Sequence, residues 1–475
     1  MKTFYWYDYE TFGLSPRVQR IAQFAGIRTD ENLNILDEHM FYCKPTHDCL
    51  PAPEACAVTG ITPQLCEQKG LIEHEFIKKI NKEFTVPQTC IVGYNSIAFD
   101  DEFTRHTLFR NFLDPYAWHW QNGNTRWDIL NVARFCYAHK EHESLEWVKN
   151  ENNRPIFKLD RLAPANAIDH ANAHDAMADV RATIGIAKII QETQPIFFNY
   201  ALSLNEKKEV SRQVKILHPM LLTSSSFGYK CSFTRMVTAL CYHPDYPDRA
   251  IVFNLEQDPE IILELDSNEL KTLVFTKKAD LPKGVDKLEL NELIFNKSPM
   301  FVCSPKPDNF KLSPLLIEKL QVDMDKCMKN LSYIQNNQKQ IEKTVQSIYK
   351  KDPEREMSND IDQSLYDNFV SNKDRKICNH IQSLSSNEIG LLNPNFEDRR
   401  LLKLFLNFKA RNYPELLSED EQEEWFEIVQ SRVQNGENGF LSFDSFENSL
   451  DNLKTSKPEK NKLWQDLEAY AQTFL

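Results

Sequence analysis

The chain has 475 residues, more than one compact core normally holds, so we expect two or three domains. Hydrophobic residues make up 41% of it and charged residues 26%, which is typical of a folded protein and argues against a disordered one. The net charge of −13 excludes a surface that is basic throughout, although a basic groove can lie beside acidic flanks.

The sequence carries no signal for export or for a membrane. No apolar run is long enough to span a bilayer, and the N-terminus runs directly into a strand-like segment instead of a signal peptide. Eleven cysteines are scattered without any C-x-x-C pair, which indicates reduced thiols. We therefore expect a cytoplasmic protein without a membrane partner.

The first 193 residues predict a mixed α/β domain. Three strands joined by short connections predict an antiparallel meander, at residues 4–10, 21–28 and 35–43. Apolar residues at helical spacing predict helices after the meander, with one short strand among them: helix 73–84, strand 90–94, helix 101–112 and helix 175–191.

The remaining residues predict two further domains. Short β-rich runs at 250–254 and 293–295 predict a small β domain, which a helical stretch at 315–349 closes. A charged segment with a proline, 350–356, is a plausible linker, and repeated amphipathic helical runs follow it. We expect domain bounds at 1–193, 195–350 and 351–475.

Two acids at the end of the first strand are the first chemical signal. Asp8 and Glu10 are two residues apart, so a strand projects both from one face, where close carboxylates repel each other and attract a cation. A bare D-x-E is more often an exposed pair of strand acids. Here apolar residues precede the pair and Thr11-Phe12-Gly13 follows, which predicts a buried strand end where charge needs a metal or hydrogen bonds.

Two later motifs supply further acids. The motif N-x-x-x-F-D at residues 95–100 places Asp100 near the start of a helix, where a plain helix cap is the simpler explanation. His174 falls at the entry to the last helix of the domain, with Asp179 about one turn later. His174 alone is compatible with a surface or capping residue, but a carboxylate beside an apolar stripe is costly to bury unpaired.

Taken together, the three motifs resemble those of the DEDD exonuclease family in their order and approximate intervals. The spacing H-x-x-x-x-D is that of the DEDDh branch, because the DEDDy branch has a tyrosine where this chain has Asp175. The resemblance implies a ribonuclease-H-like fold, which agrees with the predicted meander and the helices after it.

The chemistry follows from the ligands that these motifs offer. Magnesium prefers oxygen ligands, and two Mg²⁺ ions, or Mn²⁺ in their place, are expected on four carboxylates: Asp8, Glu10, Asp100 and Asp179. One ion would activate the attacking water and the other would stabilise the leaving 3′ oxygen. His174 is the candidate general base, because imidazole ordinarily titrates near the working pH. The expected products are 5′-mononucleotides.

Over its whole length the sequence resembles the bacterial exodeoxyribonuclease I family. The resemblance rests on residues 8–13, 41–45, 59–63, 114–118, 126–128, 296–299 and 409–414. It implies an exonuclease domain, a small SH3-like β domain and an all-α C-terminal domain. It also implies removal of nucleotides from the 3′ end of single-stranded DNA, in DNA repair and recombination.

The resemblance further implies substrate contacts, by Glu10 and by five residues outside the acidic motifs: Arg105, Tyr116, Trp120, Arg134 and Lys158. Aromatic rings offer surfaces on which unpaired bases stack, at roughly 1–3 kcal/mol per base. Cationic side chains bind phosphates regardless of sequence. The family usually has arginine where this chain has Lys158, so a point-charge contact replaces a bidentate one. We expect Trp118 to be a core residue instead.

One protein partner is implied by the resemblance, the acidic C-terminal tail of single-stranded DNA-binding protein. Arg411 either contacts this tail or braces the fold. We expect a monomer. Two alternative functions stay open, a DEDDh exoribonuclease and a catalytically inactive protein that binds single-stranded nucleic acid. A glycosidase with paired carboxylates is less favoured, because it would need no metal.

Overall fold

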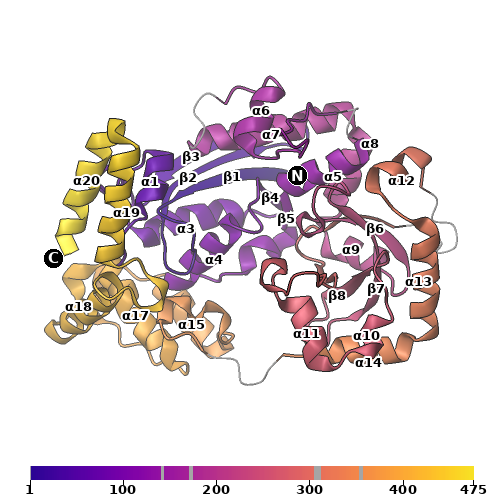
Figure 1. The fold of residues 1–475 in the computed structure, drawn as a ribbon. Helices are drawn as coiled ribbons and strands as arrows, with labels where there is room; N and C mark the ends of the chain where they lie inside the picture. The colour runs from indigo at the N-terminus through magenta and orange to yellow at the C-terminus, as the bar shows by residue number, and fades with distance from the viewer. Residues whose placement is uncertain (1, 141–143, 171–174, 304–311, 352–356, 475) are drawn as a thin grey trace. The chain divides into compact units, whose positions relative to one another are not determined.

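The structure, a computed structural model, describes residues 2–140, 144–170, 175–303, 312–351 and 357–474 (Figure 1). It divides into two compact units. Unit 1 comprises Met1–Thr125, His170–Ile184 and Glu356–Leu475, and unit 2 comprises Arg126–Asp169 and Gly185–Arg355. The chain therefore leaves unit 1 and returns to it twice.

The central sheet begins with the expected antiparallel meander. Strand β1 pairs with β2, β2 pairs with β3, and β4 joins the other side of β1 in parallel; the bounds are β1 (Thr3–Thr11), β2 (Ile21–Thr29), β3 (Ile35–Tyr42) and β4 (Thr89–Gly93). The strand order is β3-β2-β1-β4-β5, where β5 (Thr125–Asp128) starts at the last residue of this part of unit 1. Asp8 lies opposite Ala25, and Glu10 lies opposite Gln23.

Alternation along β1 sorts its side chains between two layers. Tyr5, Tyr7 and Tyr9 pack into a buried apolar cluster with Phe76, Ile80 and Phe84 of α3 (Glu73–Phe84) and with Phe103 of α4 (Asp100–Arg110). Asp8 and Glu10 point away from this cluster, because neighbouring strand residues face opposite sides. Figure 1 shows α3 and α4 on one face of the strands and α7 (Ala176–Thr193) on the other.

The C-terminal part of unit 1 is helical, as expected. Its helices are α15 (Asn372–Ile381), α16 (Ser386–Leu391), α17 (Arg399–Asn412), α18 (Glu419–Val433), α19 (Phe443–Ser456) and α20 (Asn461–Ala471). Phe446 and Trp464, from α19 and α20, share a buried cluster with Cys56 and Cys66, from α1 (Pro53–Thr59) and α2 (Pro63–Lys69). This cluster holds residues from opposite ends of the sequence in one core.

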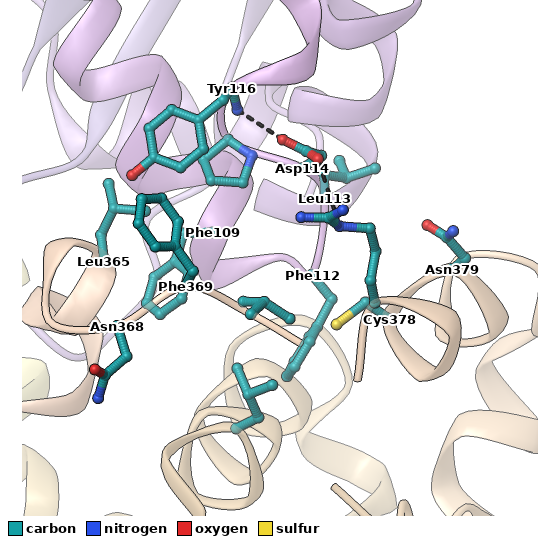
Figure 2. A pocket seen from close by; sticks show the side chains of 14 residues that line it. Phe109, Phe112, Leu113, Asp114, Tyr116, Leu365, Asn368, Phe369, Cys378 and Asn379 are labelled. Atoms are coloured by element: carbon teal, nitrogen blue, oxygen red, sulfur yellow. Dashed lines mark hydrogen bonds and ion pairs between the residues drawn. The ribbon is translucent and has the colours of Figure 1, made fainter. Parts of the chain in front are cut away.

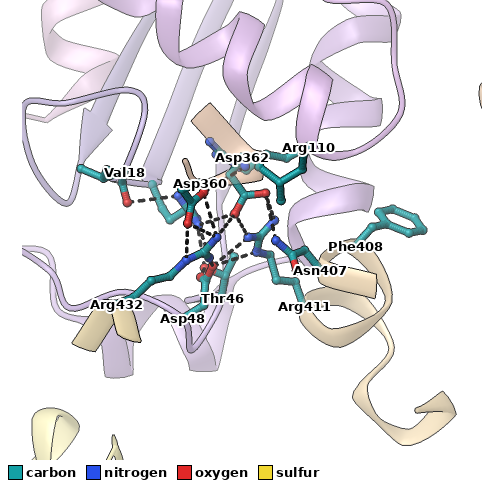
Figure 3. Close-up of polar contacts among 12 residues, drawn as sticks. Val18, Thr46, Asp48, Arg110, Asp360, Asp362, Asn407, Phe408, Arg411 and Arg432 are labelled. Carbon is teal, nitrogen blue, oxygen red and sulfur yellow. Dashed lines mark hydrogen bonds and ion pairs between the residues drawn. The ribbon is translucent and has the colours of Figure 1, made fainter. Parts of the chain in front are cut away.

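A buried network of charges also joins the early and late parts of unit 1 (Figure 3). Arg20 and Arg432 donate to the same Asp48 oxygen, at 2.8 and 2.5 Å, and Arg432 also donates to Asp362 at 2.7 Å. Arg411 pairs with both Asp48 and Asp362. Burial favours the neutral acid, but the surrounding guanidinium groups outweigh it and hold the pKa of Asp48 and Asp362 well below the ordinary range.

Unit 2 contains a second sheet, antiparallel throughout, in the order β10-β6-β7-β8-β9. Its strands are β6 (Pro219–Thr223), β7 (Thr234–Tyr242), β8 (Arg249–Asn254), β9 (Leu290–Ile294) and β10 (Met300–Cys303). The helical stretch expected at 315–349 consists of three helices, α12 (Pro314–Leu320), α13 (Met324–Asn336) and α14 (Gln338–Tyr349). Apolar side chains of all three share one core with β7 and β8.

Several shorter helices complete unit 2. They are α5 (Ile129–Lys140), α6 (Leu159–Ala165), α8 (Pro195–Ser203), α9 (Lys207–Gln213), α10 (Ile261–Glu264) and α11 (Ser267–Phe275). The β-rich region expected from residue 195 therefore opens with two helices, and its first strand begins at Pro219. None of the helices in the described part of the chain is long and apolar enough to span a membrane.

Candidate active site

The candidate site lies where β1 ends. Oxygen atoms of Asp8, Glu10 and Asp179 all lie within 4.8 Å of one another. Glu10 is buried at 8% exposure, whereas Asp8 and Asp179 are half-buried. Three carboxylates at this separation repel one another unless a proton or a cation lies among them. The structure thus brings together three of the four acids that the sequence predicted as metal ligands.

The fourth acid, Asp100, opens α4 and is 4% exposed. It lies outside the group of three, but its charge is the first of the neighbouring charges that raise the pKa of Asp8. Phe99 occupies the N-cap position of α4, so a capping role does not account for Asp100. The buried next residue, Asp101, accepts a hydrogen bond of 2.6 Å from the Tyr7 hydroxyl, which ties the start of α4 to β1.

Burial and crowding make the charged forms of these acids costly. Burial is the largest cause that raises the pKa of Glu10, to about 8, and the charges of Asp179, Asp100 and Asp175 raise it further. The pKa of Asp8 is raised well above its ordinary range by burial first and then by Asp100 and Asp179. Divalent cations bound by carboxylate oxygens would offset the repulsion between these charges, so the donor set fits Mg²⁺ or Mn²⁺.

A second cluster in unit 1 provides a contrast. Asp37, His39 and Glu83 also offer ligand atoms within 4.8 Å of one another. Here the chain supplies its own cation, because Arg28 lies 3.0 Å from the Glu83 carboxylate and 3.7 Å from that of Asp37. In the described part of the chain, the neighbouring charges that shift the pKa of Asp8 and Glu10 are all carboxylates, and no guanidinium is among them. Of the two groups found among the described residues, the β1 group is therefore the candidate metal centre.

Asp179 lies in the first turn of α7 and is held there by two kinds of contact. The backbone N–H of Ala176 lies 3.4 Å from the Gln23 side-chain oxygen, which anchors the helix start to the strand opposite Glu10. The Nε2 atom of His170 lies 2.5 Å from an Asp179 oxygen. His174, the predicted general base, lies outside the described residues. Sequence reasoning missed His170, which no motif spacing distinguishes from a surface histidine.

The predicted DNA contacts of unit 1 lie on and after α4. The Arg105 guanidinium is 5.7 Å from the centre of the Tyr116 ring and pairs with Glu102 at 2.7 Å. Trp120 is 61% exposed, which leaves its ring open to a ligand. Trp118 is fully buried, and its ring centre lies 5.2 Å from that of Phe84, so the expectation of a core residue is confirmed.

A small apolar pocket of about 60 Å³ flanks Tyr116 (Figure 2). Phe109 and Phe112 line it from α4 and the segment after it, and Leu365, Phe369 and Cys378 line it from the C-terminal part of unit 1. Asp114 shapes this region, because its carboxylate accepts the backbone N–H of Tyr116 at 2.8 Å. Phe369, which precedes α15, thus lines the same pocket as Tyr116, a predicted DNA contact.

The other two predicted contacts lie in unit 2. The Arg134 guanidinium is 5.9 Å from the Phe157 ring and donates to the Asn131 side chain at 3.1 Å. Lys158 is exposed and immediately precedes α6. Arg134 thus lies beside Phe157 in space, and Lys158 follows it in the sequence. Arg411 is buried in the charge network, so of the two roles left open for it the structure supports the bracing one.

Comparison with known proteins assigns three consecutive regions of the chain. A family model described as Exonuclease matches residues 5–187, and the Exonuclease I SH3-like domain matches residues 205–351. The Exonuclease I C-terminal domain matches residues 359–474. The mixed α/β region, the small β domain and the helical region expected from the sequence therefore correspond to these three families in order.

Two relatives that match most or all of the chain are named exodeoxyribonuclease I. Exodeoxyribonuclease I of Haemophilus influenzae is 38% identical, over 100% of this chain and 99% of its own, and that of Escherichia coli is 39% identical, over 90% and 88%. A crystal structure of E. coli Exonuclease I with a dA16 oligonucleotide superposes with a TM-score of 0.92 at 35% identity, covering 100% of both chains.

Two further solved structures are informative about ligands. A zinc-bound form of an E. coli Exonuclease I complex with single-stranded DNA has a TM-score of 0.91 at 36% identity, covering 100% of this chain and 99% of that one. A structure of SSB and Exonuclease I in complex with the inhibitor CFAM has a TM-score of 0.89 at 34% identity, covering 100% of both chains.

Proposed function

Because the chain belongs to the exonuclease I family and is therefore a nuclease, we propose that it degrades single-stranded DNA from the 3′ end and releases 5′-mononucleotides. The observation that carries the proposal is the convergence of Asp8, Glu10 and Asp179 within 4.8 Å at the end of β1, in the region that matches the exonuclease model. We place the reaction in the cytoplasm and in DNA repair and recombination.

The four acidic residues of the motifs are the proposed metal ligands: Asp8, Glu10, Asp100 and Asp179. Two bound Mg²⁺ ions, or Mn²⁺ in their place, would supply an activated water and stabilise the leaving oxygen. The raised pKa of Glu10 supports this assignment, since burial and its acidic neighbours favour a bound cation. Metal dependence accords with the family and with the zinc-bound E. coli relative, and magnesium is our specific proposal.

Other side chains are proposed to accept the proton of the attacking water and to bind the DNA strand. His174 is the proposed general base, which takes a proton from the attacking water. The proposed contacts to the strand are Glu10, Arg105, Tyr116, Trp120, Arg134 and Lys158. The exposed ring of Trp120 is suited to base stacking, and the exposed ammonium of Lys158 is suited to a phosphate.

We further propose that the chain is a monomer that divides into an exonuclease domain at 1–193, an SH3-like domain at 195–350 and a helical domain at 351–475. Its proposed protein partner is the C-terminal tail of single-stranded DNA-binding protein. The solved structure of SSB with Exonuclease I supports this partner.

Digestion of a 5′-labelled single-stranded DNA oligomer tests the proposed reaction. We expect stepwise shortening from the 3′ end with Mg²⁺, no cleavage with EDTA and little cleavage of a duplex. An RNA oligomer of the same sequence separates the alternatives. Faster digestion of RNA would point to an exoribonuclease, and binding without any cleavage would point to an inactive binding protein.

A further inference from the structure

His170 contacts the candidate metal centre from outside its ligand set. Its Nε2 atom lies 2.5 Å from Asp179 Oδ1, and the imidazole donates in this contact because a carboxylate only accepts. We infer that His170 is a positioning residue, which fixes the Asp179 carboxylate in the orientation that binds the metal ion. The inference rests on the proposed function, since it gives Asp179 the role of a ligand.

The contact is sheltered from water on the histidine side. The His170 side chain is 1% exposed and that of Asp179 is 18% exposed. A hydrogen bond between a buried donor and a carboxylate holds its geometry better than one on the surface, where water competes for both partners. His170 therefore fixes the position of one Asp179 oxygen, Oδ1, and with it the orientation of the carboxylate.

His170 forms its hydrogen bond with a residue of the candidate site and not with one that only supports the fold. Within the described residues, its other ring nitrogen, Nδ1, is buried without a hydrogen-bond partner. A histidine that only braces the fold normally satisfies both nitrogens, as His74 does with Tyr413 and Gln382, each at 2.9 Å. Among the described residues, the polar contact of the His170 ring is thus to a proposed metal ligand.

Asp179 needs such a restraint because of its surroundings. The charges of Asp8, Glu10 and Asp179 repel one another, so an unrestrained Asp179 side chain would turn toward solvent. Gln23 anchors only the backbone at the start of α7. His170 contacts the carboxylate itself. Partners that orient metal ligands in this way typically contribute about 10–100-fold to metal affinity or activity.

The test compares His170→Ala and His170→Gln with the wild-type protein. Mn²⁺ binding is measured without DNA, by electron paramagnetic resonance of the free ion, and ssDNA digestion is measured as a function of Mg²⁺. We expect His170→Ala to weaken Mn²⁺ binding about 10–100-fold and to raise the Mg²⁺ requirement similarly, with little change in KM for DNA. His170→Gln should recover part of the affinity, because its amide places an N–H near the position of Nε2.

His74→Gln is the matched control, a buried histidine of the same unit whose ring contacts Tyr413 and Gln382. It should bind Mn²⁺ as the wild type does. Unchanged Mn²⁺ affinity in His170→Ala would overturn the inference, as would a loss of kcat with affinity intact or an equal loss in the control. Wild-type protein that binds Mn²⁺ but leaves DNA intact would refute the proposed function alone, since the binding comparison does not depend on cleavage.

Discussion

Glu10 is a buried acid beside four other acids, Asp8, Asp100, Asp175 and Asp179, and this crowding determines how the metal-free protein responds to pH. Burial, followed by the charges of Asp179, Asp100 and Asp175, raises its pKa from 4.5 to about 8. An acid whose pKa is raised by folding stabilises the fold while it is protonated, and this contribution is lost as pH rises through the folded-state value. The pKa of Asp8 is shifted in the same direction, so both acids act together.

The first prediction concerns magnesium and thermal stability. Because Glu10 ionises in the fold only near pH 8, Mg²⁺ should raise Tm more well above this pH than well below it. Thermal melts with Mg²⁺ and with EDTA across this range measure the effect. In Glu10→Gln the pH dependence of the Mg²⁺ effect should be smaller. An equal gain in Tm at both ends of the range would contradict the prediction.

The second prediction compares two exposed aromatic rings. Trp120 is 61% exposed and Phe426, on α18, is 60% exposed, so their burial is matched. Trp120→Ala should weaken the binding of a single-stranded oligomer by about 1–3 kcal/mol, because one base loses its stacking surface. Phe426→Ala should leave the affinity unchanged. Fluorescence anisotropy with EDTA present measures binding without cleavage, and equal effects of the two changes would refute the stacking role.

At the scale of elements, local sequence determined most strands and helices of the nuclease region. The meander follows from three apolar runs with short connections, and α3 follows from its apolar spacing. Helices α1 and α2 could not be predicted in this way, because each has seven residues and begins at a proline, too short for a helical period to appear. Helices α8 and α9 were missed, because they open the region from residue 195 that we expected to be β-rich.

The third prediction concerns the start of α11, where both halves of a capping box are present. Asp266 accepts the backbone N–H groups of Asn268 and Glu269, and the Glu269 carboxylate accepts the N–H of Asp266. Asp266→Ala should lower the free energy of unfolding by about 0.5–2 kcal/mol, because these donors lose their acceptor. Urea unfolding measures it. The neighbouring change Ser267→Ala should be nearly neutral, and equal losses would argue against the cap.

At the scale of the whole molecule, contacts between distant parts of the sequence hold unit 1 together. Asp48 pairs with Arg411 and Arg432, 363 and 384 residues away. No local pattern predicts such pairs, which is why the role of Arg411 stayed open in the sequence. The same reason applies to His170, whose position beside Asp179 depends on how the chain enters α7. The acids of the site were predictable because strand alternation and motif spacing are local.

The fourth prediction concerns the buried charges. Asp362 is fully buried and pairs with Arg411 and Arg432. Asp362→Ala should lower the free energy of unfolding by about 3–5 kcal/mol, because it removes one of the few carboxylates that neutralise two buried guanidinium groups. Chemical denaturation measures the loss. Asp420→Ala removes an exposed acid from the first turn of α18 and should have little effect. Similar losses in both variants would show that the pairing matters little.

The buried charge network also limits when the protein can finish folding during its synthesis. Arg432 leaves the ribosome 384 residues after Asp48, a delay of roughly 20–80 s at about 5–20 residues per second. Until then Asp48 can pair with Arg20 but lacks two of the three arginines that neutralise it in the finished protein, Arg411 and Arg432. The nuclease region should therefore mature only once the last helices have been made, so a nascent chain should not acquire activity before its synthesis is nearly complete.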